Sequence, residues 1–408
     1  MKCRFCQNEL SHEFIDLGNS PLSNSFLSLE ELNAPEVYYP LKLFVCEACF
    51  LVQIDEYRKS EDIFNAGYVY FSSFSSSWLK HAQNYVAMIT DRLGLTRRSS
   101  VVEIASNDGY LLQYFKARGI PCLGIEPAES AAKVAREKGL EVVSDFFGVK
   151  LAGRLVQEGQ RADLVIGNNV LAHVPNINDF VKGLKILLKE DGVITLEFPH
   201  LLRLIEQSQF DTIYHEHFSY LSFHTVERIF AAHGLSVFDV EELPTHGGSL
   251  RIYARHQDAE AEAIAPRVQS LREQEYAAGM GDLSYYRGFQ DKANKVKYDL
   301  LTFLLDRRRQ GEKVVAYGAA AKGNTLLNYC GIREDLVSFV VDASPHKHGK
   351  FLPGSHIPVV RAIELKEHKP NYVIILPWNL EEEIREQLHY IRSWDGKFVI
   401  PIPRLTIQ

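Results

Sequence analysis

Short apolar runs alternate with amphipathic helical patterns along two long stretches of the chain. In the first stretch, from about residue 97 to 200, the apolar runs are VVEIA at 101, CLGIE at 122, ADLVIGN at 162 and VITLEF at 193. In the second, which follows a charged helical stretch from about 257 to 310, they are KVVAYGA at 313, LVSFVVDA at 336, NYVIILPW at 371 and KFVIPIP at 397. Such alternation is typical of doubly wound parallel sheets. The pattern therefore predicts two α/β domains, each with a Rossmann-like sheet.

The first 60 residues lack this alternation and are predicted to form short strands and turns. They contain two C-x-x-C pairs, whose cysteines are Cys3, Cys6, Cys46 and Cys49. Four thiolates satisfy one tetrahedral zinc ion and leave no open position for a substrate, so the spacing predicts a structural Zn²⁺. A segment this short supports little core, and we expect the metal to supply much of its folding free energy.

The length of the chain also points to several domains. At about 150 residues per domain, 408 residues correspond to two or three domains. Combined with the patterns above, we expect a zinc-binding domain over residues 1–66, a second domain over 67–256 and a third over 257–408.

Composition and charge narrow the class of protein. Apolar residues make up 46% and charged residues 24%, an ordinary globular composition that excludes wholesale disorder. The net charge of -7 and the lack of long Lys and Arg runs argue against nucleic acid as a partner. No apolar stretch reaches the roughly 18 residues of a membrane span, and the first residues lack the apolar core of a signal peptide. The sequence predicts a soluble cytoplasmic protein without membrane contact, a monomer or a weak homo-oligomer.

The turn after the strand at 101 carries small polar side chains. Glu103 lies within this strand, and the turn residues are Ser106, Asn107, Asp108 and Gly109. At the carboxyl end of a parallel strand such side chains and free backbone N–H groups face the ligand crevice, and Gly109 would let the backbone approach a ligand.

A carboxylate follows about 20 residues later, as in dinucleotide-binding folds. Glu126, next to Pro127, ends the second strand, where a carboxylate accepts hydrogen bonds from both ribose hydroxyls of a nucleoside. Because the loop lacks G-x-G-x-x-G, it favours a nucleoside without a phosphate, and S-adenosyl-L-methionine fits this description. Further cofactor contacts are expected after the next two strands, at Asp145, Phe146, Asn168 and Asn169.

Motifs in a characteristic order cover almost the whole chain. After the cysteine pairs come GYVYFSSFSSSWLKHA, EIASNDGYLL, GIEPA, NNVLAHVPN, EFPH, IYHEHFSYLS and YGAAAKGNT. With these motifs the sequence resembles the sugar C-methyltransferases that modify nucleotide-linked deoxysugars. The resemblance implies an N-terminal zinc-binding domain, a central class I S-adenosylmethionine-dependent methyltransferase domain and a C-terminal Rossmann-like domain that closes over the substrate. It also implies methylation at C-3 of a dTDP-linked 4-keto-6-deoxysugar.

Methylation of carbon requires a carbon nucleophile, and removal of the proton next to a ketone provides one as an enolate. The reaction needs a general base and a partner for the oxyanion. The segment DTIYHEHFSY is dense in titratable groups, and a histidine with a pKa near 6.5 suits proton abstraction at neutral pH. By the resemblance His217 is the base, Tyr214 and Glu216 position the base or the sugar, and His173 contacts the acceptor. His215 is equally compatible with a structural and a catalytic role.

The glycine turn in AYGAAAKGNT predicts an anion site made of backbone N–H groups and a helix dipole, with Lys322 as a point charge near the sugar or the diphosphate. The predicted substrate contacts are Tyr68, Tyr70, Ser72, Lys322 and Asn324. Three other histidines are interpreted as structural or peripheral: His200, His224 and His246.

Two alternatives remain open at this point. An O- or N-methyltransferase acting on a small metabolite needs no enolate, and a zinc-ribbon binding module could carry a degenerate methyltransferase fold. A metalloprotease is excluded, because His215 and Glu216 are not followed by the second histidine of H-E-x-x-H.

Overall fold

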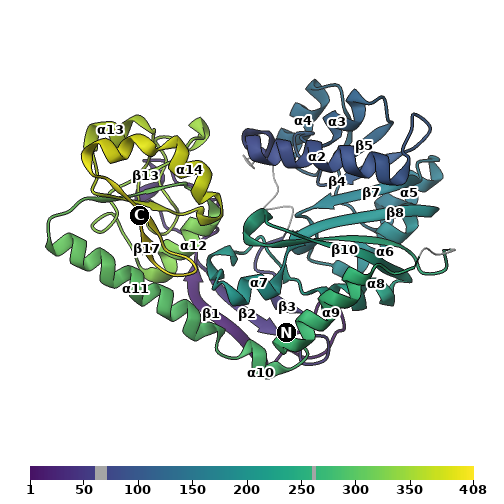
Figure 1. Cartoon of the computed structure of the whole chain (residues 1–408), viewed down its shortest axis with the longest axis horizontal. Helices are drawn as coiled ribbons and strands as arrows, with labels where there is room; N and C mark the ends of the chain where they lie inside the picture. Colours follow the sequence, from purple (N-terminus) through teal and green to yellow (C-terminus); the bar gives the residue numbers. More distant parts are fainter. Residues whose placement is uncertain (60–70, 260–262) are drawn as a thin grey trace.

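The computed structural model describes residues 1–59, 71–259 and 263–408, and three β-sheets organise this part of the chain. In Figure 1 the central sheet and the C-terminal sheet lie on opposite sides of the molecule, and the N-terminal strands, drawn in purple, lie between and below them. The arrangement confirms the predicted fold class, in which a small N-terminal part accompanies two Rossmann-like α/β parts.

The N-terminal sheet is antiparallel and takes its last strand from the middle of the chain. Its strands are β1 (His12–Ser20), β2 (Tyr39–Val45), β3 (Val52–Ile54) and β9 (Ser219–Tyr220), in that order. Leu41, Leu43 and Val45 of β2 are buried and alternate with more exposed residues, as expected when one face of a sheet is covered. Since Gln53 of β3 pairs with Ser219, the cysteine-bearing segment is joined directly to the residues that follow His217.

The central sheet is mostly parallel, with strand order β10-β11-β8-β7-β4-β5-β6. Its strands are β4 (Val101–Ile104), β5 (Cys122–Ile125), β6 (Glu141–Val143), β7 (Ala162–Asn168), β8 (Leu188–Pro199), β10 (Leu235–Leu243) and β11 (Ser249–His256). Strand β11 runs antiparallel to both of its neighbours, whereas β4 to β8 run parallel. The inner parallel strands β4 and β7 are mostly buried, because helices cover both faces of this sheet.

The helices of the central part form two layers. They are α2 (Ser76–Leu93), α3 (Leu112–Ala117), α4 (Glu129–Glu137), α5 (Val149–Gln157), α6 (Ile177–Leu187), α7 (Leu201–Glu206), α8 (Phe223–Ala232) and α9 (Pro266–Ala278). Helices α2, α3 and α4 share one core with the sheet, and α5, α6, α8 and α9 share another, which also contains three of the four N-terminal cysteines. The N-terminal part is therefore packed against one helical layer of the central part.

The C-terminal sheet repeats the doubly wound pattern with order β14-β13-β12-β15-β16-β17. Its strands are β12 (Val314–Tyr317), β13 (Val340–Val341), β14 (Val359–Val360), β15 (Tyr372–Ile375), β16 (Lys397–Ile400) and β17 (Thr406–Ile407). Its helices are α10 (Leu283–Tyr286), α11 (Phe289–Arg309), α12 (Ala321–Cys330), α13 (Ile363–His368) and α14 (Glu381–Gln387). Helix α11 spans the lower left of Figure 1 and packs on β1, where Phe289 stacks on Phe14 with ring centroids 4.8 Å apart.

Short 3-10 turns connect these elements, and several of them carry residues of the site. They are η1 (Glu31–Asn33), η2 (Ser72–Phe74), η3 (Leu171–His173), η4 (Phe210–Thr212), η5 (Thr245–Gly247), η6 (Pro345–Lys347), η7 (Trp378–Leu380) and η8 (His389–Trp394). One hydrophobic cluster runs from the N-terminal sheet through residues 201–220 into the C-terminal sheet. Segment 210–217 is therefore enclosed by all three parts of the chain. In the described ranges we find no helix with the length and apolar character needed to cross a membrane.

Candidate active site

The loop that carries the predicted base is fixed by its own backbone. His217 follows η4, and its Nδ1 lies 2.9 Å from the carbonyl oxygen of Thr212. In the tautomer that this contact favours, Nδ1–H donates to the carbonyl and Nε2 carries the lone pair. Tyr214 lies against the same ring with centroids 4.0 Å apart. The arrangement orients an imidazole that can accept a proton at Nε2.

The surroundings of His217 keep it neutral. Burial holds the pKa of His217 well below its ordinary value, and His173, His246 and Lys322 lower it further. His173, at the end of η3, packs edge-on against His217 with ring centroids 4.6 Å apart. Burial lowers the pKa of His173 to about 4. Both histidines are therefore uncharged at neutral pH and can act as hydrogen-bonding groups.

Segments from both ends of the chain hold the base loop. Thr325 of α12 donates its hydroxyl proton to the carbonyl oxygen of Ile213 at 2.7 Å. The side-chain amide of Asn24 donates to a carboxyl oxygen of Glu216 at 2.6 Å. Burial raises the pKa of Glu216 to about 7, and the hydrogen bond from Asn24 opposes this rise. Glu216 is thus bound to the N-terminal part, whereas the ring of His217 is held by a backbone carbonyl.

The C-terminal part brings a cation to the same region. Lys322, in the first turn of α12, donates to Oδ1 of Asn379 at 2.6 Å, and its Nζ lies 4.8 Å from the centre of the Trp378 ring. The indole N–H of Trp378 donates to the buried carboxylate of Asp211 at 2.8 Å. Burial raises the pKa of Asp211 to about 6, and Lys322 and Trp378 oppose this rise.

The loop after β4 lies at the carboxyl edge of the central sheet. The carboxylate of Glu126 accepts the backbone N–H groups of Asn107 at 2.9 Å and Ala128 at 2.8 Å, which fixes the loop to the end of β5. Asn107 adopts a positive φ of 49°, a conformation that asparagine tolerates better than most residues. Its side-chain oxygen accepts the backbone N–H of Ser72 at 2.9 Å.

Several buried polar atoms along this edge have no hydrogen-bond partner among the described residues. They are Ser106 Oγ, Asp108 Oδ1 and Asn169 Oδ1. A buried polar atom without a partner is costly, so these atoms mark positions where a polar ligand would complete the hydrogen bonding. The edge therefore fits a nucleoside with hydroxyl and amino groups, which is what S-adenosylmethionine presents.

The chain matches three protein families along its length. Residues 3–64 match a zinc binding domain, residues 78–240 a methyltransferase domain, and residues 244–403 the C-methyltransferase C-terminal domain. The C-methyltransferase NovU of Streptomyces niveus is 33% identical over 402 residues, which cover 98% of this chain and 95% of that protein. The chain belongs to the C-methyltransferase family.

Other similarities are partial. The ubiquinone biosynthesis O-methyltransferase of Bordetella avium is 26% identical over 134 residues, or 30% of this chain and 56% of that protein. A solved S-adenosylmethionine-dependent methyltransferase from Clostridium acetobutylicum is 11% identical, with a TM-score of 0.36, and covers 44% of this chain and 92% of its own. The predicted class of enzyme, an S-adenosylmethionine-dependent C-methyltransferase, is confirmed by the family matches and by the full-length relative.

The predicted zinc site of the C-methyltransferase has the geometry that zinc requires. The sulfur atoms of Cys3, Cys6, Cys46 and Cys49 all lie within 4.8 Å of one another. The closest pairs are 3.5 to 3.6 Å apart. Zinc–sulfur bonds of about 2.3 Å place the corners of a tetrahedron about 3.8 Å apart. The cluster would therefore close on zinc with small adjustments, and all four positions would be taken by protein.

The remaining predicted cofactor residues differ in exposure. Glu103, within β4, is buried, and burial raises its pKa well above the ordinary value. Asn168, at the end of β7, donates to the hydroxyl of Tyr110 at 3.3 Å, and Pro127 is half-buried beside Glu126. Asp145 and Phe146 are exposed, and Asp145 accepts the backbone N–H of Phe146 at 2.9 Å.

Packing inside the protein requires a glycine at position 109, in addition to the close approach of a ligand that the sequence suggested. Its φ is +76°, and a Cβ atom there would overlap Cδ1 of Leu140 and lie 3.3 Å from Cβ of Ala135. Internal packing against α4 and the residue before β6 therefore excludes a side chain at this position, whether or not a ligand approaches.

Two predicted substrate residues of the C-methyltransferase make internal contacts. Asn324 is buried, and its amide donates to the carbonyl oxygen of Ser23 at 2.6 Å. Ser72 is buried next to Asn107. Tyr68 and Tyr70 lie outside the described residues. His215, whose role was open, lies 3.2 Å from the carbonyl oxygen of Pro40 and is 4% exposed, a structural position in the core.

His246 was interpreted as structural or peripheral, and its position is not peripheral. His246 lies in η5 with a φ of 55°, and its Nε2 is 2.9 Å from the side-chain amide of Asn169. Burial, followed by the charge of Lys322, lowers the pKa of His246 to about 4. Asp211 and Trp378, which contact each other beside Lys322, were not predicted from the sequence. For His246 the sequence did contain a signal, the T-H-G-G run at 245–248. A glycine pair before a strand often marks a special backbone conformation.

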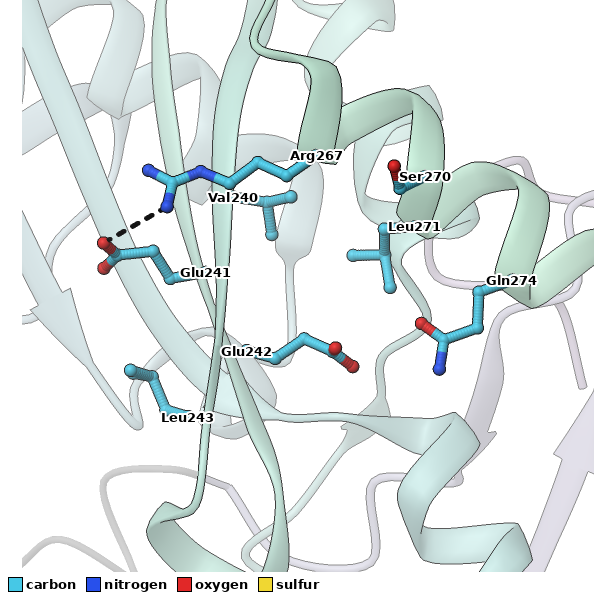
Figure 2. A pocket seen from close by; sticks show the side chains of 8 residues that line it. All are labelled: Val240, Glu241, Glu242, Leu243, Arg267, Ser270, Leu271 and Gln274. Atoms are coloured by element: carbon cyan, nitrogen blue, oxygen red, sulfur yellow. Dashed lines mark ion pairs between the residues drawn. The ribbon is translucent and has the colours of Figure 1, made fainter.

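A hollow of about 490 Å³ lies between β10 and α9. Figure 2 shows that Glu241, Glu242 and Arg267 line it, and Arg267 pairs with Glu241 at 3.6 Å. Glu242 pairs with Arg203 at 2.8 Å, and none of the predicted site residues that the structure describes lines this hollow.

Proposed function

We propose that the C-methyltransferase adds a methyl group to C-3 of a dTDP-linked 4-keto-6-deoxysugar through an enolate. The observation that carries the proposal is the neutral imidazole of His217, which is held at Nδ1 by the Thr212 carbonyl. Nε2 is then the nitrogen that removes the C-3 proton, and the electron pair of the broken C–H bond moves toward the C-4 oxygen. General base catalysis of this kind typically contributes about 100- to 10,000-fold.

The other residues in the cleft have complementary roles in this proposal. S-adenosylmethionine supplies an electrophilic methyl group on sulfur, which the nucleophilic carbon of the substrate takes up. Tyr214, which covers the ring of His217, and His173, which lies edge-on against it, orient the base and contact the acceptor. Glu216 fixes the loop through Asn24. The proton taken by His217 passes to solvent after methyl transfer.

The predicted contacts of both ligands are part of the proposal. We assign the donor to the edge of the central sheet, with contacts from Glu103, Ser106, Asn107, Asp108, Gly109, Glu126, Pro127, Asp145, Phe146, Asn168 and Asn169. We assign the sugar nucleotide to the side of the C-terminal part, where the predicted contacts are Tyr68, Tyr70, Ser72, Lys322 and Asn324. Two observations on the described residues support this division: the buried atoms without partners at the sheet edge, and the ammonium of Lys322, which donates a hydrogen bond to Asn379.

Two measurements test the function. The purified enzyme with labelled methyl donor and a dTDP-4-keto-6-deoxysugar should incorporate label at carbon, and in D2O without donor it should exchange the C-3 proton. His217→Asn should abolish exchange and leave donor binding unchanged, whereas His224→Asn, at an exposed histidine, should change neither. Label transfer to oxygen or nitrogen without proton exchange would replace the proposal with a heteroatom methyltransferase.

A further inference from the structure

The ammonium group of Lys322 has an unusual environment for a lysine in a protein interior. It is half-buried, it donates one hydrogen bond, to Asn379, and among the described residues the carboxylate whose charge acts on it is that of Asp211. A lysine ammonium has three N–H donors, so two of them remain for other partners. Burial lowers the pKa of Lys322, and Asp211 opposes this effect. An anion bound next to this ammonium would stabilise its charge.

Contacts between the parts of the chain fix where this cation lies. Lys322 and Thr325 are three residues apart and share a face of α12, and Thr325 is bonded to Ile213, one residue before Tyr214. The Trp378 ring beneath Lys322 is bonded to Asp211. Gly247 also lies against this ring, because a Cβ atom there would overlap it, with Cζ3 at 2.8 Å.

Lys322 is therefore enclosed by the two segments that carry His217 and His246. The same proximity explains why Lys322 lowers the pKa of both histidines. His217 and His246 are neutral, so the positive charge next to them is that of Lys322. A charge in this position is beside the base, where the reacting carbon of the sugar would have to lie.

The geometry points to Lys322 as a catalytic residue whose ammonium binds the C-4 oxygen of the sugar and stabilises the enolate. This assignment rests on the proposed function and changes the expected role of Lys322, which the sequence placed near the sugar or the diphosphate. When His217 removes the C-3 proton, the pair of electrons from the C–H bond forms the C-3–C-4 double bond. The negative charge collects on the C-4 oxygen, next to the ammonium. Methyl transfer to C-3 then restores the ketone, and no proton leaves Lys322.

Preorganised charge at a developing oxyanion commonly contributes about 100- to 1,000-fold in rate. Lys322→Met removes the charge and keeps a long apolar stem. We expect kcat and the rate of C-3 proton exchange to fall by about this factor, while KM for the sugar nucleotide changes only a few fold. Lys322→Arg retains the charge with a different shape and should recover part of the exchange rate.

A matched control is available on the surface of the same part. Lys366 of α13 lies 4.7 Å from the centre of the Tyr390 ring, much as Lys322 lies over Trp378, but it is exposed. Lys366→Met should leave kcat, KM and exchange unchanged. If Lys322→Met is poorly folded by circular dichroism, the comparison is made with Lys322→Gln, with the same expectation.

The outcomes separate the inference from the function on which it rests. A large rise in KM with unchanged kcat and exchange would show that Lys322 binds the diphosphate, and the catalytic assignment would be wrong. If the unmodified enzyme neither exchanges the C-3 proton nor methylates carbon, the proposed function fails before Lys322 is considered. Loss of exchange in Lys322→Met with unaltered donor binding would support both.

Discussion

Replacement of Gly109 by alanine tests why a glycine follows the first strand of the methyltransferase sheet. The residue has a φ of +76°, and its missing Cβ atom would occupy the space of Leu140 Cδ1. A left-handed backbone costs a residue with a Cβ atom about 1–2 kcal/mol, and overpacking a tight site costs about 1–3 kcal/mol more. We therefore expect Gly109→Ala to lower the free energy of unfolding by about 2–5 kcal/mol.

Gly94 provides the matched control for the backbone cost alone. It has a φ of +59° at the end of α2, and nothing lies within 4 Å of the position of its Cβ atom. Gly94→Ala should cost about 1–2 kcal/mol, so the difference between the two variants measures the packing cost. Urea unfolding followed by circular dichroism gives both values under identical conditions.

The double variant Gly109→Ala with Leu140→Ala tests the contact directly. Removing the leucine side chain creates space for the new methyl group, so the two changes together should destabilise by at least about 1 kcal/mol less than their sum. The packing argument would be refuted if Gly109→Ala were no less stable than Gly94→Ala. If Gly109→Ala were as stable as Gly94→Ala but bound S-adenosylmethionine more weakly in calorimetry, the glycine would instead be needed for donor binding.

Three further predictions concern the contacts that hold the base loop. Removing zinc with a chelator should unfold the N-terminal sheet, and because β3 pairs with β9 we expect the exchange activity of His217 to be lost together with the metal and restored with zinc. The pKa of Glu216 is about 7 in the folded chain against 4.5 ordinarily, so the folded state binds more protons and stability should fall as pH rises through this window. Glu216→Gln should flatten this dependence, by up to about 3 kcal/mol, in thermal unfolding measured from pH 4.5 to 7.5; an unchanged slope would contradict the raised pKa. Thr325→Val leaves the carbonyl of Ile213 unpaired and should lower the free energy of unfolding by about 1–3 kcal/mol. It should also lower kcat more than it raises KM. A variant as stable as the unmodified enzyme would show that the contact is dispensable.

Local patterns in the sequence were sufficient for much of the fold. The alternation of apolar runs and helical segments reflects strands buried on both faces, and this is why VVEIA, ADLVIGN and VVAY lie in parallel strands of the two sheets. The spacing of the cysteines predicted the zinc cluster for a similar reason, since two ligands on one turn need only a second such turn nearby. In both cases the signal is local: each strand and each C-x-x-C pair is formed by residues close together in the chain.

The sequence could also single out the segment of His217, because its titratable groups are contiguous, and the resemblance predicted His217 as the base. It did not show what holds the imidazole: Glu216, its neighbour in the chain, is bonded to Asn24, and the ring is oriented by the Thr212 carbonyl. Asn324 was expected to contact the substrate, but its side-chain amide donates a hydrogen bond to the carbonyl oxygen of Ser23. A side chain's direction depends on packing, which residue type and spacing do not specify.

What the tertiary structure decided lies between segments that are far apart in the chain. The N-terminal sheet is completed by residues 219–220, and Lys322 is set beside His217 through Trp378 and Asp211. His246 lies near His217 because of a similar long-range contact, the one between its side chain and Asn169. The sequence by itself determined the strands of the two α/β sheets and the zinc ligands, and it predicted His217 as the base. The position of the cation and the support of the base loop required the fold, because these contacts form only when three separately patterned parts bury a common core.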